Sequence, residues 1–489
     1  MATLDVRASQ TPFFSHQETS MTTALITHPS NNISLATDVS TESFLERLNE
    51  IDIYLNTYAE IKQFSGTVLI AQGSHPPITR SYGLANREHQ VANTVFTKFR
   101  IGSVTKQFTA AAILQLQEKG LLELQAPIST YLPDYPEGDR ITVEHLLTHT
   151  AGIPEYLNPE IFPDLLEWIR QPSTLAQLVE RFQALPLEFE PGETFRYSNS
   201  GYVLLTQIIE AVSNQTYADY LQTNIFDPLG MNDTGYEMPQ TVIANLAQGY
   251  VLVGDGVYLQ AAPLDMSIPQ GAGGLYSTTA DLATWTQWLH NEQPDATVLS
   301  AAAKTMLMQP VVQMEPETSP DMFYGYGMVA DTRFDQPRVH HNGGISGFAS
   351  SLVHYPEDSL TIAVLSNLET AVPARIAEDL AAISFQTPYE LPQPHEAIDL
   401  DPSLYEKYVG TYQLLPEMQV MIQVVEGELT AQATGQDAFV LYPMSETDFF
   451  AQVADITVTF SLSEDKTVKG LTLRQLGQEL FAPKVTDSY

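Results

Sequence analysis

Three short polar clusters follow one another along the chain: Ser103-Val-Thr-Lys106, Tyr197-Ser-Asn199 and His341-Asn-Gly343. The first pairs a hydroxyl with an amine, the second adds a phenol and an amide, and the third joins an imidazole to a glycine. Together they supply a nucleophile with a neighbouring base, a second proton carrier with a polar partner, and a strand with an oxyanion donor. The set therefore predicts serine acyl transfer, provided that the fold brings the three segments together.

The first cluster opens a predicted buried helix. An apolar run follows it at residues 108–114, and Gly120 stands where a helix C-cap is expected. A spacing of three places Ser103 and Lys106 on one helix face, about 5–6 Å apart at Cβ, and the helix N-terminus adds positive potential near the serine. A second Ser-x-x-Lys at 463–466 lies among strand-like residues and is interpreted as a charged turn. The alternative for Ser103 is an ordinary N-cap serine followed by a solvated lysine.

The second cluster is distinguished by its setting. Tyr-x-Asn also occurs at Tyr54 and Tyr156, but only Tyr197 stands between a Pro-Gly turn and an amphipathic helical segment at 201–210. A residue between a turn and a helix is held rigidly by its neighbours and remains accessible to a substrate. The alternative is a core tyrosine followed by a capping Ser or Asn199.

The third cluster contains the one His-x-Gly of the sequence. His341 and Gly343 precede Gly344 and two strand-like runs at 349–355 and 360–366. Glycines on such a strand let a substrate backbone approach closely. The alternative is a hairpin glycine cluster beside a surface histidine.

Further segments extend the pattern over roughly residues 45–385: His145-Leu-Leu-Thr-His-Thr-Ala-Gly-Ile-Pro154, Pro228-Leu-Gly-Met231, Gly271-Ala-Gly-Gly-Leu-Tyr-Ser-Thr278 and Tyr324-Gly-Tyr-Gly327. With these segments the chain resembles the serine β-lactamase and penicillin-binding protein superfamily. It is most similar to the class C-like branch of β-lactamases, family VIII-type carboxylesterases and D-aminopeptidase-like hydrolases. Many superfamily members have Lys-Thr-Gly where this chain has His341-Asn-Gly343, and a histidine there resembles the esterase and D-peptidase members.

The resemblance implies a covalent mechanism. Ser103 attacks a carbonyl carbon after giving its proton to Lys106 and Tyr197, and Tyr197 returns the proton to the leaving alcohol or amine. Lysine acts as a base near neutral pH only if burial or a neighbouring cation lowers its pKa. Asn199 is expected to orient Lys106 and a substrate amide.

The third cluster is expected to complete the site. Backbone N–H groups of Ser103 and Gly344 are expected to hold the oxyanion, with Gly343 on the same strand. His341 replaces a permanent cation with a group whose ordinary pKa is near 6.5. Activity is therefore expected to show an ionisation near neutral pH that disappears when His341 is replaced by alanine.

The predicted function is a serine hydrolase that forms an acyl-enzyme on small esters or on amide and peptide substrates. One alternative is a true β-lactamase or a D-Ala-D-Ala carboxypeptidase. An alternative of a different class is a catalytically inert binding member of the superfamily. Ser103, Lys106 and Tyr197 together argue against that last class, because a binding protein has no chemical need for all of them.

Neither a metal nor a cofactor is expected. His145 and His149 have metal-ligand spacing, but Leu146 stands where a zinc protease needs a glutamate. The chain has no cysteine, which excludes disulfides and thiolate metal sites. Its net charge of −37 disfavours nucleic acid as a partner. No stretch approaches 18 consecutive apolar residues, and no signal peptide is evident, so a cytoplasmic location without a membrane span is expected.

The expected architecture is an α/β (α+β) sandwich, in which an antiparallel sheet is flanked by helices and carries an inserted helical lobe. Residues 1–42 are expected to be unstructured, and 43–386 to form the hydrolase domain. A proline-rich linker is expected at 387–403, followed at 404–489 by a small antiparallel barrel that resembles lipocalin-like domains. This barrel offers a possible route to homo-oligomers.

Overall fold

The computed structural model describes residues 39–485, apart from 239, 254–255, 291–297, 316–318, 393–396, 416–417, 426, 435–437, 452–455, 464 and 476–477. The chain divides into a unit over residues 1–46 and a second over 47–489. The first is described only from Val39, where helix α1 begins, so most of the segment expected to be unstructured lies outside the described residues. Among the described helices, none has the length and apolar character that crossing a membrane requires.

An antiparallel sheet of eight strands forms the centre of the larger unit. Its order is β10-β11-β12-β13-β14-β15-β1-β2. The bounds are β1 (Gly66–Gln72), β2 (Ile78–Tyr82), β10 (Val312–Glu315), β11 (Ser319–Tyr324), β12 (Val329–Arg333), β13 (Gln336–Ile345), β14 (Phe348–Tyr355) and β15 (Leu360–Ser366). Because β1 pairs antiparallel with β15, strands from the two ends of the hydrolase region meet in one sheet, as predicted.

Helices and short strands surround this sheet. The helices are α1 (Val39–Glu60), α2 (Thr105–Glu118), α3 (Val143–Leu147), α4 (Leu165–Trp168), α5 (Leu175–Phe182), α6 (Asn199–Ser213), α7 (Tyr217–Leu221), α8 (Asp227–Leu229), α9 (Gln270–Gly273), α10 (Thr279–His290), α11 (Ala301–Met308) and α12 (Pro373–Phe385). The short strands are β3 (Leu84–Asn86), β4 (Val91–Ala92), β5 (Phe99–Arg100), β6 (Gly235–Tyr236), β7 (Tyr250–Leu252), β8 (Tyr258–Gln260) and β9 (Leu275–Ser277).

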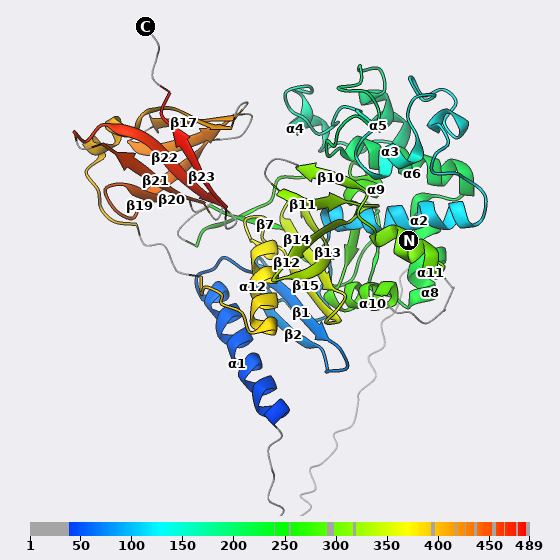
Figure 1. Cartoon of the computed structure of the whole chain (residues 1–489), viewed down its shortest axis with the longest axis horizontal. Coiled ribbons are helices and arrows are strands. Elements are labelled where there is room, and N and C mark those ends of the chain that lie inside the picture. Colours follow the sequence, from blue (N-terminus) through cyan, green and yellow to red (C-terminus); the bar gives the residue numbers. More distant parts are fainter. Residues whose placement is uncertain are drawn as a thin grey trace, which may run out of the picture. The chain divides into compact units, whose positions relative to one another are not determined.

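Both faces of the sheet are covered, which explains why every residue of β15 is buried. Ile362 and Val364 point to one face and belong to one buried cluster with Leu380 of α12; Figure 1 shows α12 next to β15. Ala363 and Leu365 point to the other face and join the core around α2. The predicted α/β sandwich is confirmed.

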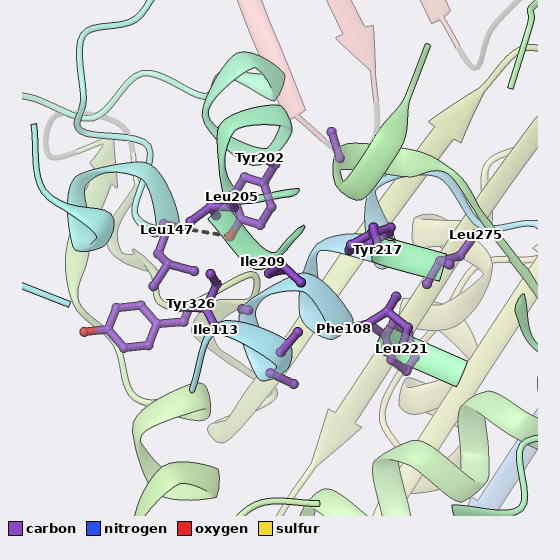
Figure 2. Close-up of a cluster of buried hydrophobic side chains, with 14 of the residues drawn as sticks. Phe108, Ile113, Leu147, Tyr202, Leu205, Ile209, Tyr217, Leu221, Leu275 and Tyr326 are labelled. Atoms are coloured by element: carbon purple, nitrogen blue, oxygen red, sulfur yellow. Dashed lines mark hydrogen bonds between the residues drawn. The ribbon is translucent and has the colours of Figure 1, made fainter. Parts of the chain in front are cut away.

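Helix α2 is the centre of the larger core. Twelve of its fourteen residues are buried, so the helix is enclosed on all sides rather than on one face. Figure 2 shows its Phe108 and Ile113 among side chains that include Tyr202 and Ile209 of α6. The Tyr202 hydroxyl donates a hydrogen bond of 2.9 Å to the carbonyl of Leu147. This rigid core supports the residues at the start of α2 and α6.

The C-terminal strands form a small barrel. They pair in chain order: β16 (Gly410–Leu415), β17 (Met418–Val425), β18 (Glu428–Ala433), β19 (Phe439–Pro443), β20 (Asp448–Ala451), β21 (Ile456–Leu462), β22 (Val468–Gln475) and β23 (Gln478–Pro483). A bridge between Tyr412 and Lys484 brings the two ends together, and Phe449 and Phe460 fill the interior with Tyr408. The predicted all-β barrel is confirmed, while its likeness to lipocalins and the domain boundaries at 386 and 404 stay predictions.

Candidate active site

Ser103 lies in a tight turn between β5 and α2. Residues Gly102–Val104 form one 3₁₀ turn, and α2 continues from Thr105. Gly102 has a φ of +49°, and a Cβ there would lie 2.9 Å from the backbone nitrogen of Gly344. Glycine at 102 therefore allows β13 to pass directly beside the serine, which joins the first and third sequence clusters.

Lys106 is the central group of the site. It is fully buried, and its Nζ lies 3.0 Å from Ser103 Oγ, 2.8 Å from Asn199 Oδ1 and 2.8 Å from the carbonyl oxygen of Ala272. Burial lowers the pKa of Lys106 from 10.5 to about 7, against an opposing effect of the nearby Glu155 carboxylate. In its neutral form the amine still donates to Asn199 and Ala272, and its lone pair accepts from the serine hydroxyl. The geometry and the basicity both suit a general base.

Tyr197 is held just before α6. Burial raises the pKa of its phenol, and a hydrogen bond with Ser103 opposes that shift. Its ring stacks on His149 with centroids 4.2 Å apart, and Lys106 Nζ lies 4.8 Å from its centroid. Because the phenol stays protonated at neutral pH, Tyr197 is suited to donate a proton and Lys106 to accept one.

His341 lies on β13 and is only 5% exposed. Its Nδ1 donates to the carbonyl of Asn342 at 2.6 Å, which leaves Nε2, 3.1 Å from the Tyr324 hydroxyl, as the acceptor. Burial, reinforced by the positive potential of Lys106, lowers the pKa of His341 to about 3. The expectation that His341 titrates near neutral pH is therefore wrong, and Lys106 is the group that titrates there.

The two glycines of the third cluster have different surroundings. A Cβ at Gly343 would lie 2.1 Å from the carbonyl oxygen of Ile101, so this glycine allows β13 to pack against the segment before Ser103. Gly344 has open space at its Cβ position and lines a cavity of about 360 Å³ together with Ser103 and Asn199. All seven predicted site residues thus lie around one place.

Two residues that the sequence analysis did not assign to the site support it. Glu155 Oε2 accepts from the backbone N–H of Asn199 at 2.5 Å, and its Oε1 accepts from that of Leu157 at 3.0 Å. This carboxylate fixes the start of α6. The buried His149 accepts at Nδ1 from the N–H of Ser198, 3.1 Å away, so it supports the Tyr197 segment. In the sequence, His149 lies within the segment from His145 to Pro154, and Glu155 directly follows that segment.

Replacing Glu155 by glutamine is expected to move the acid limb of kcat/KM to lower pH. The Glu155 charge raises the pKa of Lys106, so removing it lowers that pKa and the neutral base persists to lower pH. The shift is expected to be about half a unit to one unit. It is measured as kcat/KM from pH 5 to 9, with the exposed Glu160→Gln as the matched control. An acid limb that stays in place or moves to higher pH contradicts this assignment.

Comparisons with known proteins show which family the chain resembles. The beta-lactamase family model matches residues 55–385, and the model of a domain of unknown function (DUF3471) matches 394–485. Penicillin-binding protein 4* of Bacillus subtilis (strain 168) is 32% identical over 443 residues, or 86% of this chain and 95% of the relative. The structure of the octameric penicillin-binding protein homologue from Pyrococcus abyssi has a TM-score of 0.62 at 25% identity, covering 89% of this chain and 99% of its own. That of a D-stereospecific amidohydrolase from Streptomyces sp. has a TM-score of 0.58 at 26% identity, covering 68% and 98%.

Proposed function

Because the chain belongs to the beta-lactamase family, we propose that it is a serine hydrolase acting on amide, peptide or ester bonds through an acyl-enzyme on Ser103. The observation that carries this proposal is the 3.0 Å approach of Lys106 Nζ to Ser103 Oγ, at a lysine whose pKa is about 7. A neutral amine at hydrogen-bond distance from a serine hydroxyl is an activated nucleophile. The D-stereospecific amidohydrolase among the structural relatives supports amide substrates.

The acylation step follows from the contacts. Ser103 Oγ forms a bond to the carbonyl carbon while its proton passes to Lys106 Nζ. The N–H groups of Ser103 and Gly344 hold the oxyanion of the tetrahedral intermediate, and loss of one such donor costs about 3 kcal/mol. Tyr197 protonates the leaving nitrogen or oxygen as the bond to carbon breaks, and it regains a proton from Lys106.

Deacylation reverses these proton transfers. Water replaces the leaving group, gives a proton to the Lys106–Tyr197 pair and attacks the ester carbonyl. Ser103 Oγ then leaves as the proton returns to it. Asn199 keeps Lys106 in place in both steps through the 2.8 Å bond from Nζ to Oδ1.

The test is a panel of short p-nitrophenyl esters, amino-acid p-nitroanilides and a chromogenic cephalosporin, combined with acid quenching. Protonation of Lys106 at pH 3 stops deacylation, so the quenched protein is expected to carry the acyl mass on Ser103, located by peptide mapping. Turnover of the esters or anilides is expected to exceed that of the cephalosporin. An adduct at another residue refutes Ser103 as nucleophile, and neither turnover nor adduct favours the inert binding member.

Assembly of several copies through the C-terminal barrel is a further part of this proposal. Its support is the octameric relative from Pyrococcus abyssi, which is aligned over 89% of this chain.

A further inference from the structure

The cavity beside Ser103 is lined mainly by apolar side chains and by one carboxylate. Its walls are mostly apolar side chains, among them Leu157, Leu165, Ile169, Leu264 and Ile268. Glu369 is the carboxylate among its lining residues, and these residues include no lysine or arginine. A substrate that fills this cavity therefore meets apolar surface and one carboxylate.

Glu369 is held in place rather than free to swing away. It follows β15, and its backbone N–H donates to the carbonyl of Tyr250 at 2.9 Å. Its Oε2 accepts from the N–H of Gly347 at 2.8 Å, in the turn between β13 and β14 where Gly347 has a φ of +81°. The same β13 carries Gly344 of the cavity wall. One carboxylate oxygen stays available for a ligand among the described contacts.

Among the described residues, no cationic side chain lines the cavity to pair with a substrate carboxylate. Lys106 Nζ already contacts Ser103, Asn199 and Ala272. His341 is neutral above about pH 3, because burial lowers its pKa. The net charge of −37 adds a field that repels anions.

We propose that this cavity selects substrates bearing a positively charged amine beside an apolar group, with Glu369 as the residue that binds the amine, and discriminates against substrates bearing a carboxylate. The proposal rests on the proposed serine hydrolase function. It identifies Glu369 as a specificity residue that takes no part in bond breaking. Whether the amine belongs to the acyl half or to the leaving half of the substrate is distinguished by the test.

The test uses two pairs of substrates in which one member carries a cationic group and the other does not. In the acyl half, leucine p-nitroanilide, as D and L forms, is compared with 4-methylpentanoyl p-nitroanilide, which lacks the amine. In the leaving half, butyrylcholine is compared with 3,3-dimethylbutyl butyrate. A glutaryl mono-p-nitroanilide represents the carboxylate class. Each kcat/KM is measured for the wild type, for Glu369→Gln and for Glu357→Gln.

The glutamine at 369 can still accept from Gly347, so the loop is expected to keep its shape while the charge is lost. Glu357 is an exposed carboxylate before the start of β15, whereas Glu369 follows its end, so Glu357→Gln makes the same change in net charge away from the cavity.

In the wild type, the charged member of at least one pair is expected to be preferred. Glu369→Gln is expected to lower that preference about fivefold, the effect of a partly exposed ion pair. The uncharged member keeps its kcat/KM, Glu357→Gln changes neither, and the glutaryl anilide is the poorest substrate. The proposal is overturned if Glu369→Gln alters neither ratio or if the glutaryl anilide is preferred. Activity on the uncharged members shows that the hydrolase function stands in either case, whereas no turnover of any substrate refutes that function itself.

Discussion

Replacing Ser103 by alanine is expected to lower kcat by about three to six orders of magnitude, because the acyl-enzyme has no oxygen on which to form. The fold is expected to stay intact. Ser103 lies in a turn whose backbone conformation is determined by Gly102, and its hydroxyl faces Lys106 rather than the apolar core. The measurement is the initial rate on the preferred ester and anilide, together with the acyl mass after acid quenching.

A second serine of the cavity provides the matched control. Ser346 lines the same cavity and is half-buried, and its hydroxyl donates to the carbonyl of Ala262. Ser346→Ala is expected to retain turnover within about tenfold, since the loss of a single hydrogen bond costs about 1 kcal/mol. Equal residual activity in Ser103→Ala and Ser346→Ala would show that Ser103 only lines the cavity and is not the nucleophile.

The elements that depend on local pattern were predictable. Two strand-like runs at 349–355 and 360–366, which follow Gly344, predicted two strands, and the structure has β14 and β15 there. The apolar run after Ser103 predicted α2. The three motifs follow one another along the chain in the order that a known family has. This resemblance predicted that Ser103, Tyr197 and His341 lie close together in the fold.

Features set by contacts between distant segments were not predictable. Glu155 acquires its role from the N–H of Asn199, and Glu369 from the N–H of Gly347. The sequence separations of these two pairs match neither the helix nor the strand period, so no periodic pattern in the sequence indicates the contacts. The protonation of His341 also depends on burial against Lys106 and Tyr324, and a sequence supplies only its ordinary pKa. The electrostatics of the site and the positions of Glu155 and Glu369 thus needed the structure, whereas Ser103, Lys106, Tyr197 and His341 were proposed from the sequence.

Replacing Lys106 by methionine is expected to separate activity from stability. Turnover is expected to fall by about a thousandfold or more, because Ser103 loses its general base. A pKa lowered from 10.5 to about 7 means that burying this lysine costs about 4 kcal/mol at pH 7. Methionine removes that cost but leaves Ala272 O and Asn199 Oδ1 without their donor, at about 1–3 kcal/mol each. The free energy of unfolding at pH 7 is therefore expected to change by no more than about 2 kcal/mol in either direction.

The difference in the free energy of unfolding between wild type and Lys106→Met is expected to depend on pH. This dependence shows whether the lowered pKa of Lys106 causes the difference. Between pH 7 and 10.5 the unfolded chain binds a proton at Lys106 that the folded protein has released, so the wild type gains stability as pH rises. Lys106→Met lacks this group, and all other groups cancel in the comparison. The wild type is thus expected to gain about 2 kcal/mol on the variant between pH 7 and 9, measured from urea unfolding of both proteins. A constant difference would mean that Lys106 keeps its ordinary pKa and stays protonated, and an ammonium cannot accept the proton of Ser103. Urea unfolding of an inactive variant therefore tests the general base without a substrate.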